Sequence, residues 1–73
     1  MALQIVMDHN GDSRHFFDSG NSDDLAKAEE RFKELTGSGF TAAVRLAPGQ
    51  VARIRSFDPS AGETLFFPRL VGG

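Results

Sequence analysis

The stretch Glu63-Thr64-Leu65-Phe66-Phe67-Pro68 decides how this sequence is expected to fold. Its three consecutive large apolar residues supply apolar side chains to both faces of a strand, because successive side chains in a strand point in opposite directions. A strand that is apolar on both faces is typical of the middle of a sheet. Pro68 has no amide proton to donate, so pairing is expected to stop near Phe67. The sequence therefore predicts a central last strand over residues 63–67.

Four further strands are expected upstream of this one. Leu3, Ile5 and Met7 alternate with less apolar neighbours, so they are expected to form the apolar face of the first strand. Asn10-Gly11 is typical of a type I′ turn, which predicts that the first strand forms a hairpin with the second. The four strands are expected over residues 3–8, 14–18, 40–46 and 51–57.

A single helix is expected over residues 23–36, where apolar side chains recur at helical spacing. Ser22 is expected to cap the first turn, because its hydroxyl can accept hydrogen bonds from the free amides there. Gly37 is expected to end the helix, since glycine takes the left-handed conformation without penalty. The apolar stripe of this helix consists of Leu25, Ala28, Phe32 and Leu35.

The order strand-strand-helix-strand-strand-strand predicts an α+β domain over residues 1–68, followed by a flexible tail over residues 69–73. A mixed sheet of four or five strands with one helix packed on one face lets every element bury its apolar side. The last strand is expected to lie beside the first strand and parallel to it. The helix residues Leu25, Phe32 and Leu35 are expected to pack against Ile5, Val44, Leu65 and Phe67.

Composition narrows the classes of function. A chain of 73 residues with net charge −2 and no cysteine fits one domain and excludes a disulfide framework or a cysteine-based zinc site. The acidic balance provides no general attraction to nucleic acid or anionic membranes, and no apolar run approaches the roughly 18 residues of a membrane span. No phosphate-binding loop or dinucleotide fingerprint is visible, so we expect neither a cofactor nor self-sufficient catalysis. No secretory signal is visible either, so the expected location is the cytoplasm.

Metal ligation has two weak candidates in the first hairpin. His9 and His15 lie near aspartates in the sequence, but on a hairpin such side chains are more often solvated. The run that starts at Asp8 opens like a calcium loop, yet it holds serine at the sixth and twelfth positions, where that loop needs glycine and glutamate. We therefore expect no metal site.

The stretch from Gly62 to Gly73 resembles the end of the small sulfur-carrier subunits of molybdopterin synthase. The shared features are an acidic residue before a short apolar strand, then Phe66-Phe67-Pro68, and a terminal Gly72-Gly73. The order of the expected elements is also similar to that of ubiquitin-like β-grasp proteins. The resemblance implies a small carrier or modifier whose Gly73 carboxylate is adenylated by an activating enzyme, either for sulfur transfer or for conjugation to a protein.

Gly72 and Gly73 suit that role because residues without a Cβ pass through a narrow channel and reach unusual backbone angles. In ubiquitin-like proteins the sheet face is what partner enzymes contact, which implies a docking role for this face here. An alternative function is a non-catalytic protein–protein interaction module, of phage or mobile-element origin, that uses its sheet face. Binding of nucleic acid by the arginines is disfavoured by the acidic balance. The residues expected to dock a partner are Phe66, Phe67, Arg69, Arg45, Arg53 and Arg55.

Overall fold

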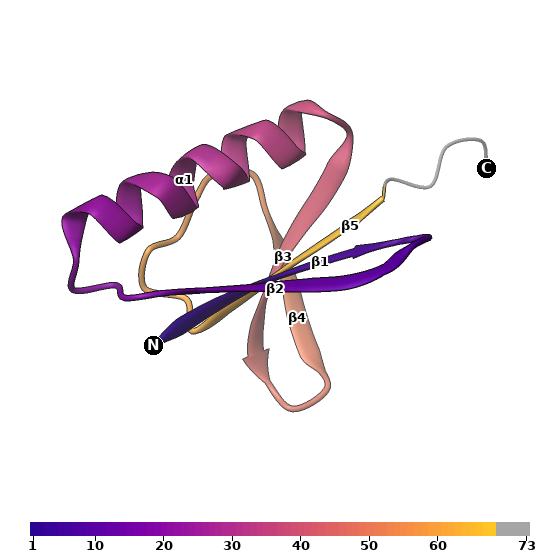
Figure 1. Ribbon diagram of the computed structural model, residues 1–73. Coiled ribbons are helices and arrows are strands. Elements are labelled where there is room, and N and C mark those ends of the chain that lie inside the picture. The colour runs from indigo at the N-terminus through magenta and orange to yellow at the C-terminus, as the bar shows by residue number, and fades with distance from the viewer. Residues whose placement is uncertain (69–73) are drawn as a thin grey trace.

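The structure, a computed structural model, describes residues 1–68. These residues form one helix and five strands in the expected order (Figure 1). The helix is one residue longer at each end than the apolar stripe predicts. The elements are β1 (Ala2–Asp8), β2 (Gly11–Phe17), α1 (Ser22–Gly37), β3 (Phe40–Ala47), β4 (Gln50–Ile54) and β5 (Glu63–Pro68).

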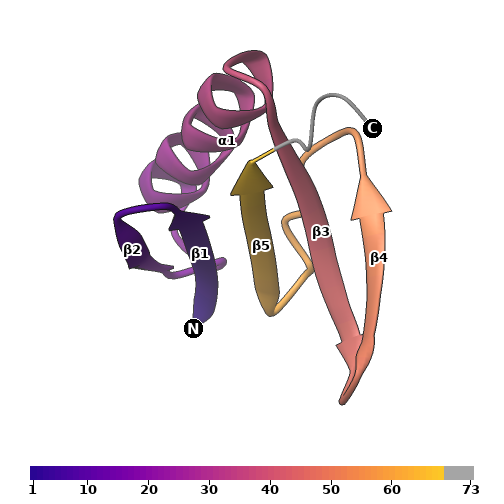
Figure 2. The same ribbon diagram turned by 90° about the vertical axis from the view of Figure 1, so that its right-hand side faces the viewer.

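The strands make one five-stranded mixed sheet in the order β2-β1-β5-β3-β4 (Figure 2). Strand β5 runs parallel to β1 and antiparallel to β3, so the last strand is central and lies beside the first, as predicted. The domain is therefore α+β, with a β-grasp-like layout in which two hairpins flank one helix and the last strand joins them.

Helix α1 covers one face of this sheet and forms the core there (Figure 1). Val6, Phe66 and Ala42 are neighbours on β1, β5 and β3, and they contact Phe32 of the helix. The rings of Phe32 and Phe66 meet edge to face at 5.7 Å between centroids, a favoured geometry for aromatic pairs. A second cluster under the start of the helix joins Ala2, Phe17 and Ala28.

The face of the sheet that packs on α1 is the opposite of the one predicted for β1 and β5. Ile5, Leu65 and Phe67 lie on the other side, while Val44 does lie on the helix side, in register with Thr64. A shift of one residue exchanges the two faces of a strand, and β5 carries apolar residues on both faces, so the sequence pattern did not distinguish them.

A buried glutamine explains which face of β1 packs on α1. Gln4 is 0% exposed beneath α1. Its amide nitrogen donates to the carbonyl of Ala28 at 3.0 Å, and its Oε1 accepts from Nη1 of Arg31 at 2.8 Å. Because both ends of this amide have partners in the helix, a polar residue takes an inward position that periodicity assigns to the solvent side.

Both ends of the helix differ by a residue or two from the predicted caps. Asn21, and not Ser22, is the N-cap, and its Oδ1 accepts from the amides of Asp23 at 2.9 Å and Asp24 at 3.1 Å. At the other end, Gly37 is still helical. Gly39 is the glycine that takes a positive φ, +100°, and it leads directly into β3.

The first hairpin turns one residue earlier than Asn10-Gly11 suggests. Asp8 pairs with Gly11, so the turn residues are His9 and Asn10, and neither has the positive φ of a type I′ turn. The carboxylate of Asp8 accepts from the amide of Asn10 at 2.7 Å, which holds this turn, and Gly11 supplies the positive φ of +119° as it begins β2. Strand β2 is consequently longer than expected.

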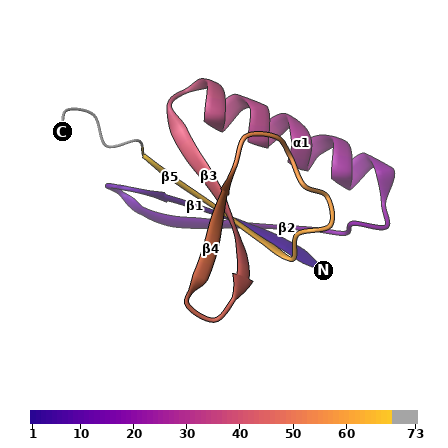
Figure 3. The same ribbon diagram turned by 180° about the vertical axis from the view of Figure 1, so that it is seen from behind.

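Strand β4 ends at Ile54, three residues before the predicted end at residue 57. Phe57 turns away from the sheet and packs under the helix, with ring centroids 6.1 Å from Phe17 and 6.0 Å from Phe32. Figure 3 shows the chain after β4 arching along α1 before it reaches β5. Strand β5, in contrast, extends one residue beyond the prediction: Pro68 lies opposite Phe40, since its carbonyl can still accept a hydrogen bond.

Candidate interaction surface

The face of the sheet opposite α1, called the open face below, is not covered by any element within residues 1–68 (Figure 1). Gln4 and Val6 contact the helix, so alternation along β1 places Leu3, Ile5 and Met7 on the open face. The three residues that sequence analysis predicted as the inner face of β1 are therefore the outer ones.

One row of side chains crosses all five strands of the open face. Its order is Arg14, Ile5, Leu65, Ala43 and Arg53, from β2 to β4. The three apolar residues in the middle are buried, since Ile5 and Leu65 are 9% exposed and Ala43 is 1% exposed. The row thus has an apolar centre and an arginine at each end.

Larger apolar side chains lie next to this row and are more accessible. Phe16 of β2 is 66% exposed and lies opposite Leu3 of β1. Leu3, Met7 and Phe67 are partly buried on the same face. An exposed large apolar group that adjoins other apolar side chains is characteristic of surfaces that bind other proteins.

The charges on the open face leave two arginines without an acidic partner. Nε of Arg45 forms an ion pair with Oε2 of Glu63 across β3 and β5. The other ion pair within residues 1–68 joins Lys33 and Glu29 on the helix, so Arg14 and Arg53 pair with no described carboxylate. Although the whole chain carries −2, this face therefore offers cations at both of its edges.

The residues expected to dock a partner or to carry the modification lie in different parts of the molecule. Phe67, Arg45 and Arg53 lie on the open face, although Phe67 was also expected to pack against the helix. Phe66 is 0% exposed and packs on Phe32, which leaves it no surface for a partner. Arg55 is exposed just beyond the end of β4. Arg69, Gly72 and Gly73 lie outside the described residues.

Phe16 and Arg14 were not among the residues expected to dock a partner. The doublet Phe16-Phe17 indicates that one large apolar side chain faces outward, because neighbouring residues of a strand point to opposite faces. Phe17 is 4% exposed beneath the helix, which forces Phe16 outward. Which member of the doublet faces out follows only from the pairing of β2 with β1.

The two histidines do not lie together in a way that suggests a metal centre. His15 is opposite Gln4 on the helix side of β2, whereas His9 is in the turn. Partial burial, and secondarily the nearby Arg31 guanidinium, lower the pKa of His15. Within residues 1–68 there is no group of three or more histidine, aspartate or glutamate side chains placed to hold a metal ion.

Comparisons with known proteins provide no relative: no family model, curated protein or solved structure matches this chain. In the described part of the chain, no helix has both the length and the apolar character needed to cross a bilayer.

Proposed function

We propose that the protein is a non-catalytic protein-binding module that docks a partner on its open face. The observation that carries the proposal is Phe16, which is 66% exposed beside Leu3 on a sheet face that no described element covers. Burying such a side chain against another protein removes apolar area from water, which favours association.

The arginines define the chemistry of the partner. Arg14 and Arg53 end the central row on opposite strands, and neither has a described acidic neighbour in an ion pair. A partner surface with an apolar centre and carboxylates at its rim would match this pattern. Charges at the rim of an interface speed encounter and fix orientation more than they add affinity.

Site-specific photo-crosslinking in cells of the source organism tests this proposal. A photoreactive amino acid at Phe16 should capture a partner, whereas the same group at Lys33 on the exposed side of α1 should not. Binding of the captured protein, once purified, should weaken with Phe16→Ser and with Arg14→Glu. If the helix position captures the same partner and Phe16 does not, the open face is not the docking surface.

A second candidate function is the carrier or modifier that acts through Gly73. The observation that favours it is the β-grasp-like layout, in which β5 is a central strand that ends at Pro68, shortly before Gly72-Gly73. This arrangement agrees with the resemblance to sulfur carriers. In such a protein the activating enzyme would be the acidic partner of the open face, so the two functions are compatible.

Intact mass and ATP–pyrophosphate exchange with candidate activating enzymes from the source organism test the carrier function. The wild-type chain should be adenylated or thiocarboxylated, and deletion of Gly73 should abolish this while the chain still folds. Gly62→Ala, at an upstream glycine with open space around it, is the control and should remain a substrate. If the wild-type carboxylate is never modified, the carrier function fails, while docking on the open face is unaffected.

A further inference from the structure

Within residues 1–68, two positions of β3 have a paired strand on one side and none on the other. Strand β3 begins at Phe40, and β5 pairs with it from that residue onward. Strand β4 pairs with β3 only from Ala42, which lies opposite Ile54. Phe40 and Thr41 therefore have a β5 partner on one side and no β4 partner on the other.

The core explains why β4 stops short. The chain bends at Arg55 and then carries Phe57 beneath the helix, where its ring meets Phe17 and Phe32. The backbone cannot follow the edge of β3 to its start and also place Phe57 in the core. The gap beside Phe40 and Thr41 is thus a fixed consequence of core packing.

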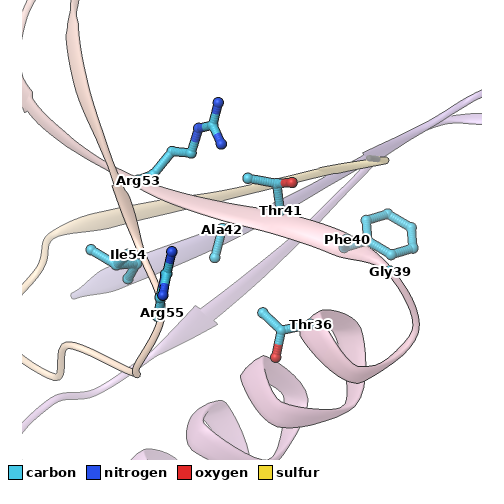
Figure 4. Close-up of a pocket in the computed structure, with 8 residues that line it drawn as sticks. All are labelled: Thr36, Gly39, Phe40, Thr41, Ala42, Arg53, Ile54 and Arg55. Atoms are coloured by element: carbon cyan, nitrogen blue, oxygen red, sulfur yellow. The ribbon is translucent and has the colours of Figure 1, made fainter. Parts of the chain in front are cut away.

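This gap is part of a groove of about 460 Å³ between β3, the end of β4 and the last turn of α1. In Figure 4, Thr41 and Arg53 lie on one side of the β3 ribbon, and Ala42, Ile54 and Arg55 lie on the other. The volume is within the range of roughly 300–1,000 Å³ that is usual for ligand sites. The groove therefore has room for a short segment of another chain.

The lining of the groove that residues 1–68 provide is cationic and contains no carboxylate. Arg53 and Arg55 are both exposed, and neither takes part in an ion pair with another residue of the described chain. Thr36 also lines the groove, but its hydroxyl already donates to the carbonyl of Phe32 at 2.8 Å. Two guanidinium groups, each suited to two parallel hydrogen bonds with a carboxylate, thus dominate its polar chemistry.

We infer that this groove binds an extended, acidic peptide segment of a partner protein. The segment adds to the sheet beside Phe40 and Thr41, where β4 is missing, and its carboxylates contact Arg53 and Arg55. Backbone pairing at a sheet edge provides affinity in this type of recognition, and side-chain contacts provide specificity. An inorganic anion would leave the strand edge unfilled, and an apolar helix would leave both arginines buried without a partner.

This inference goes beyond docking on the open face and does not depend on it. The groove is at the β3–β4 edge, whereas Phe16 and Arg14 are on β2, at the opposite edge of the sheet. Arg53 borders both surfaces. Arg55 belongs only to the groove, which makes it the informative position for a test.

The test is a titration of the ¹⁵N-labelled full chain with an acetylated, amidated peptide of alternating glutamate and valine. We expect the largest amide shifts, and slower amide exchange, at Phe40 and Thr41. The same peptide with lysine in place of glutamate should bind at least about tenfold more weakly, since it loses charge-assisted hydrogen bonds. Shifts centred on β2 and β1, or no saturable binding at millimolar peptide, would overturn the inference.

Charge-reversal variants locate the site. Arg55→Glu should weaken binding of the glutamate peptide about tenfold or more, and Arg55→Gln should have an intermediate effect. Lys27→Glu on the exposed side of α1 changes the net charge by the same amount as Arg55→Glu and should leave binding unchanged. Equal weakening by both reversals would mean that only overall charge matters, and the groove would then not be the site. The amide spectrum of each variant establishes that it is folded.

Discussion

At the scale of single residues, Gln4 is the unusual member of the core. It is the polar residue whose amide joins the central part of the sheet to Ala28 and Arg31 of the helix. A buried side-chain amide is tolerated when both its oxygen and its nitrogen are hydrogen-bonded. A buried group that loses its hydrogen-bond partner destabilises the fold. Gln4 therefore specifies which face of β1 packs on α1 as well as contributing to stability.

Replacing Gln4 with leucine should destabilise the domain by about 1–3 kcal/mol, because the half-buried Arg31 guanidinium loses its partner. Urea unfolding followed by circular dichroism measures this change in the free energy of unfolding. Gln50→Leu is the matched control, since Gln50 is exposed at the start of β4; it should change stability by less than about 0.5 kcal/mol. Equal effects of the two substitutions would contradict the role given to Gln4.

His15 makes stability depend on pH in a predictable direction. Burial and Arg31 lower its pKa in the folded chain, so the unfolded chain binds this proton more tightly. Its stabilising contribution is therefore complete above the ordinary histidine pKa of about 6.5 and is lost as the pH falls below that value. Urea unfolding of wild type and His15→Gln between about pH 8 and about pH 5 should show a smaller pH dependence in the variant.

At the scale of elements, the helix begins where a side chain can reach its free amides. Asn21 accepts from two of them and Ser22 from none that is described. The acidic residues Asp23 and Asp24 in the first turn add a favourable interaction with the helix dipole. The start of α1 is thus well specified locally, but by the residue before the predicted cap.

Asn21→Ala should lower the free energy of unfolding by about 0.5–2 kcal/mol, the usual cost of losing an N-cap. Ser22→Ala should have little effect, because alanine is the better helix former inside the first turn. Thermal unfolding of the two variants side by side provides the comparison. If Ser22→Ala lost more stability than Asn21→Ala, Ser22 would be the N-cap, and the hydrogen bonds assigned to Asn21 would be contradicted.

The strands show how much of the surface could be predicted from periodicity. Alternation predicts that Arg53 and Arg55 share one face, with Arg45 beside them if the loop has three residues. In the structure Arg45 and Arg53 share the open face, but Arg55 lies beyond the end of β4. The row from Arg14 to Arg53 was not predictable, because it depends on the register between strands that are distant in sequence. Each register is set by packing of the whole sheet against α1, and no single strand carries that information.

At the scale of the whole molecule, the order of the strands in the sheet determines which strand amides are protected from exchange with solvent. Strands β1 and β5 have a strand on both sides, as does β3 from Ala42 onward, whereas β2 and β4 are edges. We expect the amides of β1 and β5 to exchange most slowly with solvent deuterium, because they open only with the whole domain, and those of β4 to exchange fastest. Amide exchange followed by NMR measures this order. If β5 exchanged as fast as β4, the last strand would not be central in solution.

The order of the elements, the position of the helix and the central place of β5 could all be predicted from the sequence. These are local properties: helical spacing from Leu25 to Leu35, and three large apolar residues in succession at Leu65, Phe66 and Phe67. They do not depend on what each segment later contacts, which is why the α+β class was predictable. The parallel pairing of the first and last strands was predictable because few arrangements of these elements bury every apolar side.

Which face of each strand is buried depends on contacts that form only in the folded domain. Phe66 and Phe67 are equally apolar, and Gln4 becomes an inward residue only because Ala28 and Arg31 lie within hydrogen-bonding distance. Phe57 likewise leaves its strand because a space between Phe17 and Phe32 exists once the helix has docked. Burial is a property of the assembled fold, since the free energy of moving a side chain out of water depends on its neighbours. The open face and the groove beside β3 are both consequences of which side chains are buried under the helix.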